Sequence, residues 1–145
     1  IEANIIKPIY EEMALEIGHK KAEKILGAAI EKAAIEQGKS LAEESKGGPS
    51  LKAFISLFER WKMGGALEVE VLQETDEQFD FNVTRCRYAE TYKEMGLGKI
   101  GHLLSCGRDG SFCKGYNPNI ELDRGQTIMQ GATHCDFRYR VQKAS

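Results

Sequence analysis

A change in hydrophobic period near residue 66 is the feature that most constrains how this chain folds. Before it, apolar residues recur every three or four positions; after it, Leu67, Val69 and Val71 alternate with glutamates. The first period places apolar side chains on one face of a helix, and the second on one face of a strand. The sequence therefore predicts an α+β fold with a helical half at about 1–65 and a sheet-forming half at about 66–145.

The helical half predicts two amphipathic helices. From Pro8 to about Ser45 the residues favour helix, with a thin apolar face made of Ala22, Ile25, Leu26, Ala29, Ile30 and Ala33. Such a face can pack closely against another helix or against another subunit, so a homo-oligomer is one possibility. In a lone domain the same face is ordinary core. After a Gly-Gly-Pro break, Ser50 is a good N-cap for a second helix, whose large apolar residues extend to Trp61.

The second half predicts two β-hairpins with a helical insertion between them. The first hairpin spans Leu67 to Val83, and the second pairs Ile120 and Leu122 with the stretch from Phe137 to Val141, turning near Gly131. The insertion contains a short helix, from about Cys86 to Met95, and a glycine-rich stretch at 96–115 with short helical turns. We expect the N-terminal helices to pack on a small antiparallel sheet, and residues 1–145 to form a single domain.

Composition excludes several classes of function. The 145 residues are 41% hydrophobic and 29% charged, which is typical of a globular domain. The formal net charge of -2 gives no field that would gather nucleic acid or an anionic membrane, so neither partner is expected. No stretch reaches the ~20 apolar residues of a membrane span, so we expect a cytoplasmic protein with reduced cysteines.

Candidate chemistry is concentrated between Phe81 and Tyr139. Arg85 and Arg87 lie where a predicted strand passes into a helix, and an arginine side chain can bind a carboxylate at two points. We expect them to bind a substrate carboxylate. The alternative is that both are surface charges paired with Glu90 or Glu94.

The run L-S-C-G-R-D places Cys106 and Asp109 one helical turn apart, so both can face one cavity. Arg108 beside the thiol would lower its pKa and make Cys106 a nucleophile or ligand, while Asp109 could act as a base. A buried cysteine next to a surface ion pair is the alternative.

His134 and Cys135 enter the last predicted strand as neighbours, so they face opposite sides of the sheet. Cys135 is expected to point inward, because it shares its parity with Phe137 and Tyr139, and His134 is a proton carrier suited to neutral pH. No cofactor is expected. A metal site drawn from Cys86, Cys106, Asp109, His134 and Cys135 stays open, although their spacing matches no common zinc motif.

Four runs, R-C-R-Y-A-E-x-Y, L-S-C-x-R-D, G-Y-N-P-x-I-x-L-x-R-x-Q-T-I-M-x-G and H-C-D-F-R-Y, occur in this order and resemble the L-2-amino-thiazoline-4-carboxylic acid hydrolase family. The resemblance covers about Phe81 to Tyr139. It implies a hydrolase that opens a cyclic substrate carrying a carboxylate, such as 2-amino-thiazoline-4-carboxylate, to N-carbamoyl-cysteine. Residues on the family's pattern positions are Cys86, Cys106, Asp109, Asn117, Pro118, Gly131, Cys135 and Phe137.

On this reading Cys106, Asp109 and His134 are the catalytic candidates. The substrate-binding candidates are Arg85, Arg87, Asn117, Arg124 and Cys135. The hypothesis requires three distant segments to meet around one hollow that contains a thiol, a carboxylate and a guanidinium.

A fainter resemblance supplies a rival function. The ending Gly131-x-x-x-Cys135-x-Phe137 is similar to the close of the 4-vinyl-reductase type of small-molecule-binding domain, whose architecture is α+β. It implies a noncatalytic pocket for a small ligand that signals through an oligomer. The many aromatic residues of the chain would suit such a pocket or an ordinary core equally.

Overall fold

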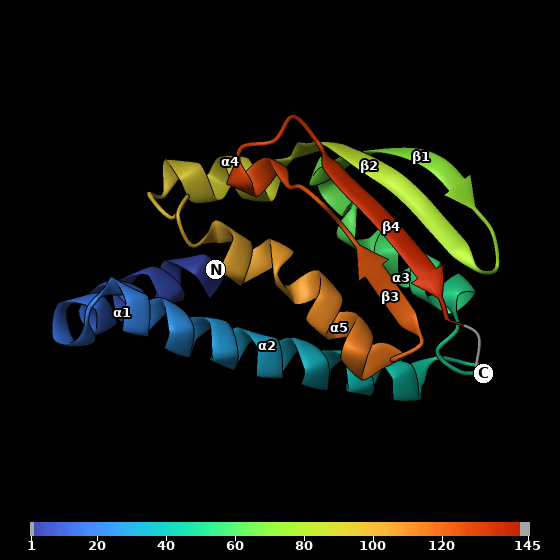
Figure 1. Ribbon diagram of the computed structural model, residues 1–145, viewed down its shortest axis with the longest axis horizontal. Helices are drawn as coiled ribbons and strands as arrows, with labels where there is room; N and C mark the ends of the chain where they lie inside the picture. The colour runs from blue at the N-terminus through green and yellow to red at the C-terminus, as the bar shows by residue number, and fades with distance from the viewer. Residues whose placement is uncertain (1, 143–145) are drawn as a thin grey trace.

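The computed structural model describes residues 2–142 and shows helices packed against one antiparallel sheet (Figure 1). In chain order the elements are α1 (Glu2–Ile17), α2 (His19–Glu44), α3 (Leu51–Trp61), β1 (Leu67–Glu74), β2 (Gln78–Cys86), α4 (Arg87–Glu94), a π-helical turn (His102–Cys106), α5 (Arg108–Tyr116), β3 (Ile120–Asp123) and β4 (Cys135–Val141). Short 3-10 turns at Met63–Gly65 and Ile128–Gln130 complete the set. The predicted α+β class is confirmed.

The predicted first helix is in fact two helices. Gly18 separates α1 from α2 with φ 88, a left-handed conformation that favours glycine, and α1 folds back beside α2 (Figure 1). The predicted apolar face of α2 is also wrong in part. Its buried residues are Ala22, Leu26, Ala34 and Gly38, whereas Ile25 is 52% exposed and Ala29 and Ala33 are exposed. The buried row follows i, i+4 spacing because α5 covers it at Gly38, and Leu97, Ile100 and Leu104 cover it at Leu26.

The predicted helix with large apolar residues is confirmed as α3. The side chain of Ser50 accepts a hydrogen bond from the backbone N–H of Ala53 at 3.1 Å, which satisfies one of the free N–H groups of the first turn. Phe54 and Phe58 are buried in the main core against the sheet. They stack edgewise or tilted on rings of β2 and β4, including Phe81 and Tyr139.

The two hairpins join into one four-stranded antiparallel sheet in the order β1-β2-β4-β3. Cross-strand partners such as Phe81 with Phe137 place the buried side chains of β2 and β4 on the same face. On the opposite face Arg140 pairs with Asp80 of β2. Arg140 is in register with Glu121 of β3, but its carboxylate partner lies on the other side, in β2.

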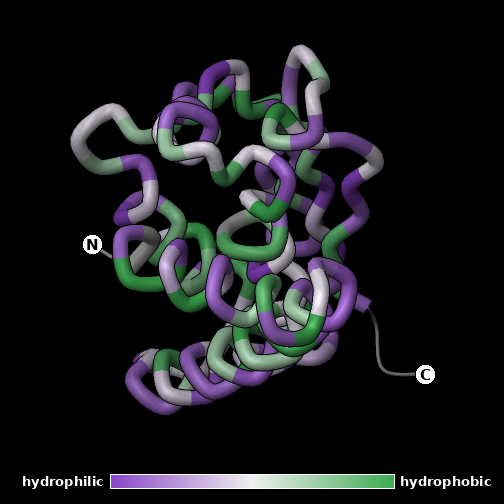
Figure 2. Tube along the Cα trace, turned by 90° about the vertical axis from the view of Figure 1, so that its left-hand side faces the viewer, coloured by the Kyte–Doolittle hydropathy of each residue, from purple (hydrophilic) through white to green (hydrophobic). Residues whose placement is uncertain are grey.

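The helix α5 lies between α2 and the sheet (Figure 1). Two glycines allow α2 and α5 to touch backbone to backbone: a Cβ atom added at Gly38 would collide with the carbonyl oxygen of Phe112, and one at Gly115 would collide with that of Ile35. In the helices, hydrophobic and hydrophilic stretches follow one another along the chain, as expected for amphipathic helices (Figure 2). This close crossing fixes the position of α5, whose first turn carries Arg108 and Asp109.

A second, smaller core lies at the other end of α2. Leu26 packs there with Leu97, Ile100 and Leu104, and α1 adds partly buried residues that include Tyr10. Among residues 2–142, no helix combines the length and the apolar character needed to span a bilayer.

Candidate functional site

A cavity of about 340 Å³ lies between the helices and the sheet. It is lined by Gln37, Phe58, Trp61, Leu67, Val83, Cys86, Tyr88, Tyr92, Leu104, Cys106, Arg108, Asp109, Phe112, Cys135 and Phe137. The three segments that sequence analysis singled out therefore meet around one hollow, with a thiol, a carboxylate and a guanidinium in its wall. Most of the lining is aromatic or aliphatic, which is typical of a pocket for a small organic molecule.

Asp109 is the acidic group of this cavity and is held by Arg124. The Arg124 Nη1 donates to Asp109 Oδ2 at 2.7 Å, and Nη2 donates to the carbonyl oxygen of Cys106 at 2.8 Å. Burial raises the pKa of Asp109 to about 6 even though Arg124 acts in the opposite direction. A carboxyl group with this pKa can both take and return a proton near neutral pH.

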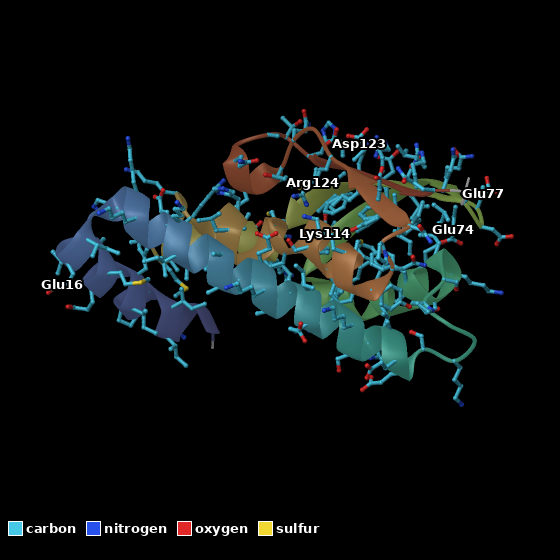
Figure 3. The ribbon with its side chains drawn as sticks, turned by 60° about the horizontal axis from the view of Figure 1, so that its bottom comes forward. Glu16, Glu74, Glu77, Lys114, Asp123 and Arg124 are labelled. Atoms are coloured by element: carbon cyan, nitrogen blue, oxygen red, sulfur yellow. The ribbon has the colours of Figure 1, made fainter. Side chains whose placement is uncertain are left out.

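Arg124 is positioned by the end of β3 and by the loop that follows it. The backbone N–H groups of Gly125 and Gln126 donate to the carboxylate of Asp136, at 3.2 and 2.8 Å. The guanidinium lies 5.0 Å from the ring centroid of Phe137, a cation–π contact. Figure 3 shows Arg124 between the strand end and the helices, whereas the exposed Asp123 lies on the outer side of the sheet. Arg124 therefore positions Asp109, and it is not one of the residues that line the cavity.

Cys106 lines the cavity, but its surroundings oppose the thiolate. Burial first, and then the negative charge of Asp109, raise the pKa of Cys106 to about 12. The expectation that Arg108 would lower this pKa is wrong, because the guanidinium of Arg108 turns to α2 and donates to Gln37 Oε1 at 2.7 Å. At neutral pH Cys106 is a neutral thiol.

Cys86 and Cys135 are the other two thiols in the cavity wall, and all four cysteines of the chain are free. Burial raises the pKa of both. The backbone N–H of Ile128 donates to the Sγ of Cys135 at 3.2 Å. The backbone N–H groups of Tyr88 and Ala89, at the start of α4, oppose the rise in the pKa of Cys86 in the same way. Cys135 is 5% exposed and faces inward with Phe137, as the strand parity predicts, while His134 precedes β4 and is partly exposed.

Three residues that line the cavity are accessible to solvent. Tyr88 is 41% exposed, Gln37 is exposed, and Arg108 is partly exposed. Arg108 and Gln37 thus bring a charged group and an amide from two helices to the cavity wall. Gln37, Phe58 and Trp61 belong to the helical half, where sequence analysis looked for no chemistry.

Besides Arg124, four predicted site residues lie outside the set that lines the cavity. Arg85 is exposed and pairs with Glu90, with Nε and Oε1 2.9 Å apart. It is therefore a surface charge paired with Glu90, which was the alternative to a role in substrate binding. Arg87 is also exposed. Asn117 is structural: its Nδ2 donates to the carbonyl oxygen of Pro49 at 2.7 Å, which ties the end of α5 to the loop before α3. His134 contacts Gln126 instead of the cavity.

Metal ligands were a further alternative for these residues. Within the described part of the chain, no group of three or more His, Cys, Asp or Glu side chains is arranged to hold a metal ion.

Comparison with known proteins agrees with the motifs. The model of the L-2-amino-thiazoline-4-carboxylic acid hydrolase family matches residues 1–139. The chain belongs to this family. The match extends over the N-terminal helices as well as the motif-bearing half, so the residues that α2 and α3 contribute to the cavity lie within the family's shared region. No curated protein that was compared with the chain matches it.

A solved structure shares the fold of this family member. The phenol-responsive sensory domain of the transcription activator PoxR, determined with phenol, superimposes with a TM-score of 0.58 at 11% sequence identity, covering 94% of this chain and 73% of that chain. At this identity the likeness concerns the fold alone. It agrees with the α+β architecture predicted from the sequence.

Proposed function

We propose that this protein is a hydrolase that opens a small cyclic amidine bearing a carboxylate, such as 2-amino-thiazoline-4-carboxylate, to N-carbamoyl-cysteine. The observation that carries the proposal is the position of Asp109 in the wall of an otherwise largely apolar cavity, clamped by Arg124 and with a pKa of about 6. The family name supports the reaction class.

The reaction needs a group that moves protons, and Asp109 suits this task. Water adds to the carbon between sulfur and nitrogen, the carbon–sulfur ring bond breaks, and the sulfur leaves as a thiol. One proton of the water goes to the departing sulfur and the other to the ring nitrogen, so the product is a urea. As the carboxylate, Asp109 takes a proton from the attacking group, and as the acid it returns a proton to the sulfur.

The rest of the cavity binds and orients the ring. We assign the substrate carboxylate to Arg108, because this guanidinium lines the cavity and Gln37 orients it. This assignment replaces Arg85 and Arg87. Aromatic walls such as Trp61 and Phe112 exclude water from the flat ring and strengthen the electrostatic interactions around it.

Turnover of 2-amino-thiazoline-4-carboxylate by the purified protein tests the proposal. The product is measured as a new low-molecular-weight thiol and identified as N-carbamoyl-cysteine by mass spectrometry. Replacement of Asp109→Asn keeps the shape of the side chain and should lower kcat by about 10²-fold or more. Asp123→Asn, which changes an exposed carboxylate next to Arg124, is the matched control and should keep wild-type activity. Full activity in Asp109→Asn would refute the assigned role.

A noncatalytic sensor is the second candidate, and the aromatic lining of the cavity together with the fold of the PoxR sensory domain favours it. Trp61 is the single tryptophan of the chain and lines the cavity, so its fluorescence reports on occupancy. Under this reading phenol added to the protein should quench Trp61 fluorescence saturably, and the thiazoline should remain intact after prolonged incubation. Turnover of the thiazoline decides for the hydrolase.

A further inference from the structure

We propose that Cys135 is the nucleophile of the cavity and that it bonds transiently to the amidine carbon of the substrate. This inference rests on the proposed hydrolase function and deepens it: the hydrolysis occurs in two steps through a covalent isothiourea on Cys135. It replaces Cys106, which the sequence favoured for this role.

Backbone N–H groups favour the thiolate of both Cys86 and Cys135, and at Cys135 the N–H meets the sulfur with hydrogen-bond geometry. The Sγ of Cys135 accepts the backbone N–H of Ile128 at 3.2 Å, so a donor already faces the sulfur. An N–H group directed at sulfur favours the thiolate and steadies it as it forms. The negative charge of Asp109 opposes ionisation of both Cys106 and Cys135, but it outweighs Arg124 at Cys106 and is outweighed by Arg124 at Cys135.

Charges around Cys135 support the same assignment. Arg124 favours the ionised form of Cys135, as it does that of Cys106, whereas the neighbouring Cys86 opposes it at Cys135. The guanidinium of Arg124 lies over the ring of Phe137, two residues further along β4 than Cys135. The same arginine holds Asp109 at 2.7 Å. Cys135 and Asp109 both line the cavity, so a thiol and a proton acceptor face one volume, with Arg124 tied to the acceptor and near the thiol.

The position of Cys135 on the sheet makes it a rigid nucleophile. It begins β4, where it is paired with Val83 of the neighbouring strand β2, and it is 5% exposed. A side chain on a paired strand holds its direction better than one on a loop, and positioning of the attacking atom is a large part of its catalytic effect.

The two steps balance as follows. In the first, the sulfur of Cys135 bonds to the amidine carbon while its proton passes to Asp109; the carbon–sulfur ring bond then breaks, and Asp109 protonates the departing ring sulfur. In the second, water adds to the same carbon while Asp109 takes one of its protons. The carbon–Cys135 bond breaks, that proton returns to the Cys135 sulfur, and the other goes to the former ring nitrogen, giving the urea.

The mechanism names a chemical class of substrate. The reactive group is an amidine or isothiourea carbon with a sulfur leaving group, so open-chain S-alkyl isothioureas of similar size should also react with Cys135. Simple cyclic ureas such as hydantoins lack the sulfur leaving group and should not accumulate an adduct.

Trapping the covalent adduct tests the inference in the intact wild-type protein. Acid quenching during turnover of 2-amino-thiazoline-4-carboxylate should leave a fraction of the protein heavier by the mass of one substrate molecule. Peptide mapping should place that mass on Cys135. An adduct mapped to Cys86 or Cys106 would overturn the proposal, as would turnover in which no adduct is trapped and Cys135→Ala remains fully active.

A second measurement does not depend on turnover. Limited treatment with 2-chloroacetamidine, an amidine that alkylates thiols, should modify Cys135 several times faster than the other three cysteines, and an excess of the thiazoline should protect it. Equal labelling of all cavity thiols would overturn the assignment. If the wild-type protein fails to open the thiazoline but labels selectively at Cys135, the proposed substrate is wrong and the reactive thiol stands.

Variants complete the test. Cys135→Ala should lower kcat by at least about 10³-fold, while Cys113→Ala, which removes a buried thiol outside the cavity wall, should keep it. Thermal unfolding of both variants separates loss of the nucleophile from loss of the fold. A folded Cys135→Ala variant with wild-type kcat would contradict the inference and leave the proposed hydrolase function intact.

Discussion

Replacement of Gly38→Ala tests the close crossing of α2 and α5. The added Cβ would collide with the carbonyl oxygen of Phe112 and lie 2.8 Å from the backbone nitrogen of Tyr116. Both neighbours are backbone atoms of α5 and cannot rotate away, so the helices must move apart. Overpacking of this kind costs about 3 kcal/mol at its upper end, and alanine recovers about 1 kcal/mol of helix propensity. The expected net loss is about 2 kcal/mol.

The same substitution elsewhere in α2 provides the control. A Cβ at Gly27 would lie 3.6 Å from Leu103 Cδ2, which is ordinary van der Waals contact. Gly27→Ala should therefore stabilise the protein by about 0.5–1 kcal/mol through helix propensity alone.

Thermal and urea unfolding of the two variants measure this difference. We expect Gly38→Ala to lower Tm by about 4–8 °C and Gly27→Ala to raise it slightly. Because α5 carries Asp109, Gly38→Ala should also weaken ligand binding in the cavity. A Gly38→Ala protein as stable as Gly27→Ala would show that the two helices do not touch as described.

Three further predictions concern the core and the acid of the cavity. Phe81→Ala removes a fully buried ring stacked on Phe137 and should reduce the free energy of unfolding by about 3–5 kcal/mol, measured by urea denaturation. The folded-state pKa of Asp109 is raised from 3.8 to about 6, so the folded state retains a proton that the unfolded chain loses; between these pH values wild-type stability should fall with rising pH relative to Asp109→Asn, and a flat difference would contradict it. Arg124→Met removes the cation that lowers the pKa of Asp109, so the midpoint of a carbon-13 NMR titration of the Asp109 carboxyl should move upward; an unchanged midpoint would show that Arg124 does not set it.

Local sequence rules predicted most of the fold because its elements have strong local causes. Ser50 caps α3, Gly96 ends the turn after α4 with φ 77, and alternation sets the faces of β2 and β4. What sequence missed depends on contacts between distant segments. The buried face of α2 is chosen by α5, which touches it at Gly38 and Gly115, and spacing within α2 alone cannot select between overlapping apolar rows.

The candidate site, like the fold, was predicted from the sequence only in part. Motifs drew attention to Cys106, Asp109 and Cys135, and these three line the cavity. The motifs could not show which arginine acts at the site, because a positive charge in the sequence does not reveal which carboxylate the side chain will meet. Arg85 pairs with the exposed Glu90, whereas Arg124 pairs with Asp109. Arg108 could have been proposed from its position next to Asp109, because both residues belong to the first turn of α5 and both line the cavity.

One physical distinction separates an enzyme from a binding domain on this fold. An apolar cavity of about 340 Å³ suffices to bind a small ring, and burying a carboxyl group in it works against its ionised form, as the raised pKa of Asp109 shows. A site that only binds apolar ligands gains nothing from keeping such a group, and still less from an arginine that holds it in place. The clamp of Arg124 on Asp109, beside a thiol that accepts an amide N–H, is accounted for if the cavity must take and return a proton during a reaction. The proposed hydrolysis would explain why the polar groups lie where they do, whereas a binding function would explain only the aromatic walls.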